Sequence, residues 1–288
     1  MNLNVLLIGA SGLLGTDVAE AARVRGWTLE TPGRDDLDLA DERSVLAYFL
    51  NCDADWILNC AAYTNVDGAE TDLDAANMLN AAAPFSLARQ ARRLGSRFLQ
   101  MSTDYVFDGK RGEPYTENDP TDPVNSYGKS KLQGEELVRE EDPNALIVRS
   151  SWLFGNGGRC FPKSIIMAAK KGNPLRVVDD QKGSPTYTRD LAEALIRLVE
   201  ISAPGGVYHV VNSGEATWFE FAKECIEAAG IKVAITLIKT EDWPTAAPRP
   251  LNTVLDTTKF RSLGLDALPD WKDAVTRFVD QLDLDALP

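Results

Sequence analysis

Residues 9–15 have the sequence Gly9-Ala10-Ser11-Gly12-Leu13-Leu14-Gly15 and follow directly on the apolar run at residues 3–8. A glycine-rich turn between a strand and a helix lets backbone N–H groups and the positive helix N-terminus face a pyrophosphate, which side chains would obstruct. The spacing G-x-x-G-x-x-G leaves one alternative, a turn that needs glycine only for its own backbone. The predicted dinucleotide contacts are Gly9, Ser11, Gly12, Leu13, Leu14 and Gly15.

The first half of the chain alternates short apolar runs with longer helix-like stretches. The runs lie at residues 3–8, 27–31, 55–60, 97–101 and 145–150, and the stretches at residues 13–25, 67–93 and 126–141. Strands that are apolar throughout and alternate with helices are typical of a parallel sheet covered on both faces. We therefore expect an α/β fold built on a Rossmann-like, doubly wound parallel sheet.

The later chain has a different character. Prolines become frequent after Trp152 and separate shorter helix-like stretches at residues 191–200 and 218–229. We expect a dinucleotide-binding domain at residues 1–150 and a smaller C-terminal substrate-binding lobe at residues 151–288. No linker marks the boundary between the two. The second half of the chain can therefore also contribute later strands to the first domain.

Charge and hydropathy exclude several classes of partner. The net charge is −13 and no basic run occurs, which argues against nucleic acid and anionic membranes. The apolar start is too short for a signal peptide, and no stretch approaches roughly 18 apolar residues. We expect a cytoplasmic protein.

Cysteine and histidine usage gives no metal or disulfide pattern. The four cysteines, Cys52, Cys60, Cys160 and Cys225, lack C-x-x-C spacing, and His209 is the one histidine of the chain. Such scattered residues do not make a zinc site. We expect each cysteine to be a small buried side chain in a reducing compartment.

A pair of residues suited to proton transfer follows later. Tyr127 and Lys131 lie four residues apart in a helix-compatible segment after Pro123, so their side chains share one face. The pKa of a free tyrosine is about 10, and an adjacent ammonium lowers it, which allows the pair to serve as general acid for a carbonyl. A hydroxyl of Ser102-Thr103, at the end of an apolar run, can bond the same carbonyl oxygen. A surface tyrosine and an ordinary loop entry are the alternatives.

The loop after the second apolar run bears on the choice of cofactor. Arg34 favours NADPH, because an arginine here accommodates the 2′-phosphate, whereas an acid takes the ribose 2′-hydroxyl of NADH. Asp35 and Asp36 follow immediately and keep NADH open. We assign Asp38 and Leu39 to the border of the adenine, with a solvated acidic loop as the other interpretation.

Small residues follow the third apolar run, in Cys60-Ala61-Ala62-Tyr63. They allow a cofactor to pass close to the carboxyl edge of the strand, where ligands bind in open α/β sheets. We therefore assign all four to the cofactor site. A tight contact between helix and sheet would also explain the alanines.

Taken together, the motifs give a resemblance over essentially the full length. They lie at residues 9–15, 59–67, 102–109, 127–131, 149–155, 180–186 and 249–250. The chain resembles the dTDP-4-dehydrorhamnose reductase family, within the extended short-chain dehydrogenase/reductases. The resemblance implies that NADPH or NADH delivers hydride to the C4 ketone of dTDP-4-dehydro-L-rhamnose, the last step in the synthesis of dTDP-L-rhamnose for polysaccharides.

The same resemblance implies roles for individual residues. Tyr127 would supply the proton, Lys131 would hold the nicotinamide ribose and tune the tyrosine, and Thr103 would orient the carbonyl. A planar cation such as an arginine suits a nucleotide diphosphate. The implied substrate contacts are Thr103, Asp104, Tyr105, Trp152 and Arg249.

Other implications of the resemblance are less local. The family's histidine after the alanine pair is replaced here by Tyr63, which leaves the nearby cofactor and sugar contacts open. Some members form dimers with Mg²⁺ at the interface, so we expect a homodimer, but the sequence identifies no ligand for the metal.

Two other functions stay open. The regulatory subunit of methionine adenosyltransferase shares this fold and turn, although intact Thr103, Tyr127 and Lys131 favour catalysis. The other alternative is a different nucleotide-sugar reductase, epimerase or dehydratase. A dehydratase needs an acid/base pair beside the threonine, and Asp104-Tyr105 do not form the Asp-Glu pair expected there.

Overall fold

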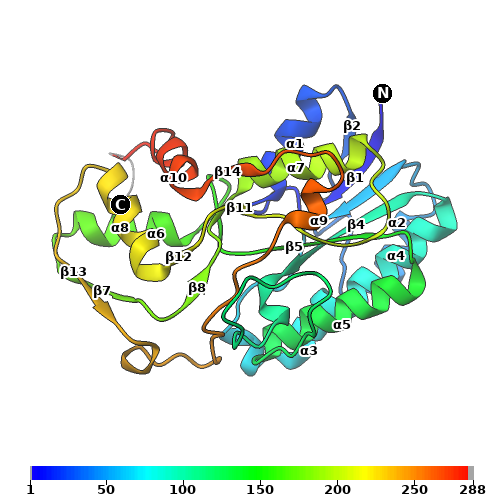
Figure 1. Ribbon diagram of the computed structural model, residues 1–288. Coiled ribbons are helices and arrows are strands. Elements are labelled where there is room, and N and C mark those ends of the chain that lie inside the picture. The colour runs from blue at the N-terminus through cyan, green and yellow to red at the C-terminus, as the bar shows by residue number, and fades with distance from the viewer. Residues whose placement is uncertain (1, 285–288) are drawn as a thin grey trace.

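Each apolar run of the first half forms a strand in the computed structural model, which describes residues 2–284. The strands build one six-stranded sheet in the order β10-β5-β4-β3-β1-β2, with every neighbouring pair parallel (Figure 1). The expected Rossmann-like α/β sheet is thus confirmed. Its strands are β1 (Asn4–Ile8), β2 (Thr28–Glu30), β3 (Trp56–Asn59), β4 (Arg97–Thr103), β5 (Leu146–Ser150) and β10 (Gly206–His209).

Helices cover both faces of this sheet, because its strands are apolar on both sides. On one face lie α1 (Gly15–Val24), α7 (Thr188–Glu200) and the short α9 (Thr258–Arg261), which share one buried cluster with the strands. A second cluster joins the other face to α2 (Glu42–Tyr48), α4 (Ala83–Leu94) and α5 (Ser126–Glu141). None of the helices in the described part of the chain is long and apolar enough to cross a bilayer.

The order of strands reverses between β1 and β3. From β1 the chain moves outward to β2, and it then returns to pair β3 with the other side of β1. Ligands of open α/β sheets bind beyond the carboxyl ends of the strands at such a point. The turn after β1 and the segment after β3 therefore meet where a cofactor is expected.

The helix-like stretch predicted at residues 67–93 is interrupted in the structure. It consists of η1 (Gly68–Glu70), α3 (Leu73–Asn77), the π-helix η2 (Met78–Ala82) and then α4. Asp72 restarts the helix by accepting a hydrogen bond from the Ala75 N–H. Periodicity alone did not predict these breaks, because a side-chain cap and one wide turn leave the apolar pattern nearly unchanged.

The second half both completes the sheet and forms a smaller lobe. β10 pairs with β5, while α6 (Phe161–Lys170), α8 (Trp218–Ala228) and α10 (Trp271–Val279) surround an aromatic cluster (Figure 1). The division at residue 150 stays a prediction, and the last four residues of the predicted lobe lie outside the described part of the chain. The lobe's paired strands are β6 (Leu153–Phe154) with β9 (Thr186–Tyr187), β7 (Leu175–Val178) with β13 (Ile235–Ile238), β8 (Lys182–Gly183) with β12 (Ala216–Thr217), and β11 (Asn212–Ser213) with β14 (Leu268–Asp270).

A buried ion pair joins helix α5 to strand β5, next to β4. The Glu135 carboxylate accepts hydrogen bonds of 2.6 and 2.8 Å from Arg149 and one of 2.5 Å from Ser102 Oγ. His209 lies beside this cluster, with Nδ1 3.1 Å from the Tyr115 carbonyl oxygen and Nε2 3.5 Å from Arg149 Nη1. Burial, and next the positive charge of Arg149, lower the pKa of His209 to about 3.

This shift predicts a loss of stability in mild acid. The unfolded chain takes up a proton on His209 below its ordinary pKa of 6.5, whereas the folded chain does not until about 3. The free energy of unfolding should therefore fall as the pH drops below 6.5, by about 1.4 kcal/mol per pH unit. Between pH 7 and pH 5, urea unfolding should show that the free energy of unfolding of the wild type falls by about 2 kcal/mol through His209. His209→Asn should lack this part of the fall.

The comparison isolates His209 because all other titrating groups are common to both proteins. Buried carboxyls with raised pKa values, such as Asp104 and Glu117, act in the opposite direction, since they bind protons more readily in the folded state. An equal acid loss in both proteins would exclude His209 as its source.

Candidate active site

The glycine turn after β1 is packed too closely for side chains. Gly9 has φ of +80°, and a Cβ added to it would lie 2.7 Å from the Ala61 nitrogen. A Cβ on Gly15 would lie 2.0 Å from the Gly9 carbonyl oxygen, while the Gly12 N–H donates to that same oxygen at 3.0 Å. The turn therefore presents backbone to the crevice at the carboxyl ends of β1 and β3.

The start of α1 offers unpaired donors in this crevice. Leu14 caps the helix without any side-chain hydrogen bond. The Thr16 N–H donates to the Gly12 carbonyl at 3.2 Å and the Asp17 N–H to the Leu14 carbonyl at 3.1 Å, so the N–H groups of Leu14 and Gly15 are the ones left for a ligand at this helix start. Ser11 and Gly12 are exposed, whereas Leu14 and Gly15 are buried. These residues fit a dinucleotide pyrophosphate through backbone contacts.

A loop from the smaller lobe lies against this turn. A Cβ on Gly157 would lie 2.1 Å from Thr16 Oγ1 and 3.0 Å from the Gly12 carbonyl oxygen, and Leu13 packs against the lobe's aromatic cluster. Sequence reasoning missed this loop. The adjacent glycines 157 and 158 were the signal that could have indicated a close approach of two backbones.

The segment after β3 is fixed by a buried asparagine of the π-helix η2. Asn80 accepts a 2.9 Å hydrogen bond from the Tyr63 N–H and donates one of 3.0 Å to the Tyr63 carbonyl. Its amide also donates to Ser130 Oγ at 3.0 Å, on helix α5. Asn80 thus joins the predicted cofactor segment to the helix that carries Tyr127. Sequence reasoning missed it because the π-helix was not foreseen.

Replacing Asn80 with Ala should weaken both stability and cofactor binding. The Tyr63 N–H would lose its partner, and an unsatisfied buried polar group costs about 1–3 kcal/mol. We expect a lower urea midpoint and a raised KM for NADPH, measured with initial rates. Asn77→Ala, at an exposed position of α3, is the matched control. Equal behaviour of the two variants would contradict the role of Asn80.

The end of β2 and the loop after it contain both a basic residue that favours NADPH and acidic residues that favour NADH. Arg34 is exposed, and its Nε lies 3.9 Å from Asp38 Oδ1. Leu39 is half-buried and packs on the sheet's second cluster. Glu30, the last residue of β2, occupies the position where an acid meets the ribose, and its carboxylate accepts a hydrogen bond of 2.5 Å from Tyr48. The sequence analysis missed Glu30 because it placed the end of the strand one residue later.

Thr103, Asp104 and Tyr127 meet between the end of β4 and the start of α5. Thr103 Oγ1 donates to Asp104 Oδ1 at 3.0 Å and accepts from the Tyr105 N–H at 3.2 Å. The Tyr127 hydroxyl lies close enough to Thr103 for that residue to lower the pKa of Tyr127, and the Tyr127 ring meets that of Tyr105 edge to face with centroids 6.0 Å apart. The structure therefore brings together the residues predicted for proton transfer.

Lys131 lies one helical turn further along α5 and is buried. Its Nζ donates a 2.7 Å hydrogen bond to the Met101 carbonyl oxygen in β4. Burial lowers the pKa of this ammonium to about 8, against an opposing effect of the Glu135 carboxylate. The neighbouring Cys60 thiol is also buried, which raises its pKa to about 12. The Cys60 thiol is therefore uncharged at neutral pH.

The pKa of Tyr127 differs from the sequence prediction. An adjacent ammonium was expected to lower it, but burial raises it to about 12, the nearby hydroxyl of Thr103 lowers it, and the Asp104 carboxylate raises it. Lys131 does not reverse this because its Nζ is directed to the Met101 carbonyl. The prediction of a lowered pKa is wrong for this structure, and Tyr127 holds its proton firmly at neutral pH.

Asp104 is a second titratable group within bonding distance of the site. Burial raises the pKa of its carboxyl to about 7, while the nearby hydroxyls of Thr253 and Thr103 lower it. Burial also raises the pKa of Tyr105 above its ordinary value. A reacting carbonyl beside Thr103 thus meets several hydroxyl groups that keep their protons at neutral pH.

Trp152 and Arg249 approach from the smaller lobe. Trp152 follows two residues after the end of β5, where Ser150 pairs with Thr103. Arg249 Nη2 donates to Asp67 Oδ2 at 3.0 Å, and Asp67 Oδ1 accepts from the Ala247 N–H at 3.0 Å. An anion that binds Arg249 must therefore share it with Asp67.

The segment that carries Arg249 is also bonded to the start of α5. Asn125 caps this helix by accepting from the Gly128 N–H at 2.8 Å, and its amide donates to the Pro248 carbonyl at 2.9 Å. One buried side chain thus connects the helix of Tyr127 to the segment of Arg249. Sequence reasoning did not single out Asn125, although an asparagine before a predicted helix is a capping signal.

The described residues contain no group of three or more His, Cys, Asp or Glu side chains that could hold a metal ion. The one ring nitrogen pair, in His209, is committed to Tyr115 and Arg149.

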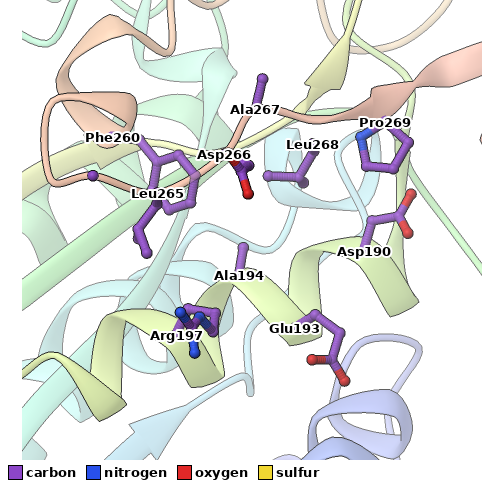
Figure 2. Close-up of a pocket in the computed structure, with 11 residues that line it drawn as sticks. Asp190, Glu193, Ala194, Arg197, Phe260, Leu265, Asp266, Ala267, Leu268 and Pro269 are labelled. Atoms are coloured by element: carbon purple, nitrogen blue, oxygen red, sulfur yellow. The ribbon is translucent and has the colours of Figure 1, made fainter.

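A cavity of about 330 Å³ lies elsewhere, between α7 and the segment at residues 264–269 (Figure 2). Three of its charged side chains form ion pairs: Asp190 with Arg277 at 2.7 Å, Glu193 with Arg25 at 2.6 Å and Arg197 with Glu200 at 2.9 Å. None of the predicted site residues is among its described lining residues. Figure 2 shows Phe260 and Leu265 above α7, so this is a groove beside the helix and not the reaction site.

The fold and the site define a class. A parallel Rossmann-like sheet with a glycine turn after β1, and a Tyr-x-x-x-Lys pair on the helix after β4, has the organisation of an extended short-chain dehydrogenase/reductase. More particularly, the chain belongs to the RmlD substrate binding domain family, whose model matches residues 3–284.

Individual relatives match over nearly the whole chain. The spore coat polysaccharide biosynthesis protein SpsK of Bacillus subtilis (strain 168) is 39% identical over 277 residues, covering 96% of this chain and 97% of that protein. The dTDP-4-dehydrorhamnose reductase of Mycolicibacterium smegmatis is 36% identical over 278 residues, covering 96% and 84%. The crystal structure of dTDP-4-dehydrorhamnose reductase from Bacillus anthracis str. Ames in complex with NADP has a TM-score of 0.94 at 35% identity, covering 98% of this chain and 100% of that chain.

Proposed function

We propose that this protein is an NADPH-dependent reductase that converts dTDP-4-dehydro-L-rhamnose to dTDP-L-rhamnose, the last step of dTDP-rhamnose synthesis. The observation that carries the proposal is the meeting of Thr103 at the end of β4 with the ring pair of Tyr105 and Tyr127, next to the buried Lys131 and on the sheet that also carries the glycine turn. The curated dTDP-4-dehydrorhamnose reductases and the NADP-bound relative support the same reaction.

Bound NADPH would supply the hydride for the C4 ketone. Gly9, Gly12 and Gly15 shape the backbone cradle for its pyrophosphate, and Arg34 is the cation for its 2′-phosphate. Ser11, Leu13 and Leu14 complete the turn. The loop residues Asp38 and Leu39 border the adenine in this proposal, and the wall toward the nicotinamide is Cys60, Ala61, Ala62 and Tyr63.

Tyr127 supplies the proton to the carbonyl oxygen. Its raised pKa keeps it protonated before the reaction, and the alkoxide that forms on hydride addition is a stronger base than a phenolate. Thr103 bonds the same oxygen and aligns it. Lys131 retains donors beyond its bond to Met101, and these are available to the hydroxyls of a ribose.

The sugar nucleotide is held from the other side. Asp104 and Tyr105 flank the reacting carbon, Trp152 covers the sugar with its indole, and Arg249 meets the diphosphate. We place these contacts between the dinucleotide-binding domain at residues 1–150 and the lobe at residues 151–288.

The decisive assay is oxidation of NADPH, followed by its absorbance, with freshly generated dTDP-4-dehydro-L-rhamnose. Identification of dTDP-L-rhamnose as the product supports the proposal. Folded protein that binds NADPH and gives no turnover would refute it. A regulatory subunit and an epimerase are not favoured by the relatives, and the same assay distinguishes them, because neither consumes NADPH in this reaction.

Assembly and location belong to the same proposal. We propose a cytoplasmic homodimer, with no nucleic acid among its partners, to be tested by light scattering of the purified protein with and without Mg²⁺. A monomer under both conditions would contradict the dimer.

A further inference from the structure

Trp152 has a backbone conformation that side chains rarely adopt. Its φ is +47°, in the left-handed region, where a bulky residue other than glycine is strained. Such strain persists only where surrounding contacts hold the residue in place, and it concentrates at functional positions. The contacts of Trp152 therefore decide where its indole points.

The indole of Trp152 contacts a strand backbone and a second indole. A Cβ added to Gly183 of β8 would lie 2.4 Å from Trp152 Cε2, so only glycine fits there. The ring of Trp218 is stacked on the Trp152 indole, with centroids 3.6 Å apart and planes at 9°. The Thr186 N–H donates to the Trp152 carbonyl oxygen at 3.2 Å and fixes the backbone of Trp152.

Trp218 is itself held in one orientation. It is the first residue of α8, whose cap is the reciprocal bonding of Thr217 and Glu220. Its Nε1–H donates to Gln181 Oε1 at 3.1 Å, and the Gln181 amide donates in turn to Thr240 Oγ1 at 3.0 Å. The segment at residues 180–186, a motif of the sequence analysis, thus provides both the glycine against Trp152 and the glutamine that orients Trp218.

Both rings lie at the edge of the lobe's aromatic cluster and are only partly buried. The centre of that cluster is formed by buried side chains such as Phe154, Phe221 and Trp271. Core packing alone would not need a near-parallel indole pair at its rim. The pair extends the rigid cluster outward to the residue that we assign to the sugar.

We propose that Trp218 is a positioning residue that holds the Trp152 indole against the sugar of the substrate. This inference rests on the proposed function, because it takes Trp152 as the sugar contact. Trp218 acts through Trp152, so its loss should raise KM for the sugar nucleotide. It should leave KM for NADPH unchanged.

The experiment compares Trp218→Leu, Trp218→Phe, Trp152→Leu and the double variant by steady-state kinetics with both substrates. Trp271→Leu is the matched control, because Trp271 also begins a helix in the same aromatic cluster but contacts Phe221 rather than Trp152. We expect Trp218→Leu to raise KM for the sugar nucleotide about tenfold or more. Trp218→Phe, which keeps a flat ring, should restore the wild-type value.

Non-additivity tests whether the two tryptophans act as one unit. The double variant should be no worse than Trp152→Leu alone, since Trp218 has nothing left to position. Additive losses, or a Trp218→Leu variant that matches Trp271→Leu in KM and differs only in thermal stability, would overturn the inference.

Near-UV circular dichroism provides a readout that does not depend on turnover. Trp218→Leu and Trp152→Leu should remove the same signal of the stacked indoles, and Trp271→Leu should retain it. Distinct changes in the two variants would overturn the inference even if the wild type proved inactive. An inactive wild type would refute the proposed function alone. A Trp152→Leu variant with unchanged KM would show that Trp152 does not contact the sugar, and the inference would fail with it.

Discussion

Tyr127→Phe should lower kcat by about 10²–10⁴-fold, because phenylalanine keeps the ring but has no proton to donate. The ring can still pack edge to face on Tyr105, so the start of α5 should be unchanged. NADPH should bind as in the wild type, since the glycine turn lies on a different element. The measurement is single-turnover reduction of dTDP-4-dehydro-L-rhamnose, together with a fluorescence titration of NADPH.

The matched control is Tyr105→Phe. Both tyrosines are half-buried, and they contact each other, but it is the hydroxyl of Tyr127 that we assign to proton donation beside Thr103. We expect kcat to fall much less in Tyr105→Phe than in Tyr127→Phe. Comparable losses in the two variants, or unchanged turnover in Tyr127→Phe, would remove Tyr127 from its role as proton donor.

Local sequence patterns were sufficient to predict the sheet and much of the site. β1, β3 and the first three residues of β5 are mainly apolar, and a strand of that kind is recognisable without its partners. The glycine turn and the Tyr127/Lys131 pair are local as well, since three or four residues bring each set of groups together. This is why the structure places Tyr127 and Lys131 one turn apart on α5, as predicted.

The unpredicted contacts are those between segments distant in the sequence. Asn80 reaches Tyr63 and Ser130 only because a π-helix rotates it inward, and Trp218 reaches Trp152 only after the lobe has folded. The error over the pKa of Tyr127 has the same origin. Helical spacing placed Lys131 on the same face, but it could not show that the Met101 carbonyl would accept its ammonium hydrogen or that burial would dominate.

Gly15→Ala should separate cofactor binding from proton transfer. The added Cβ would lie 2.0 Å from the Gly9 carbonyl oxygen, far inside van der Waals contact, and both atoms belong to the tight turn after β1. The turn must open, which costs about 1–3 kcal/mol of stability and moves the N–H groups of the cradle. We expect NADPH to bind at least about tenfold more weakly, a loss of about 1.4 kcal/mol or more.

The site of Thr103 and Tyr127 is on other elements, so kcat of Gly15→Ala at saturating NADPH should stay near the wild-type value. Gly112→Ala is the control, because a Cβ there meets nothing within 4 Å and its φ is not positive. Isothermal titration with NADPH and thermal unfolding of both variants complete the test. If Gly15→Ala folded and bound NADPH as tightly as Gly112→Ala, the turn would not be the cofactor cradle. Because Tyr127→Phe should show the reverse pattern, with binding intact and turnover lost, the two variants together locate the dinucleotide and the proton donor on separate elements of one sheet.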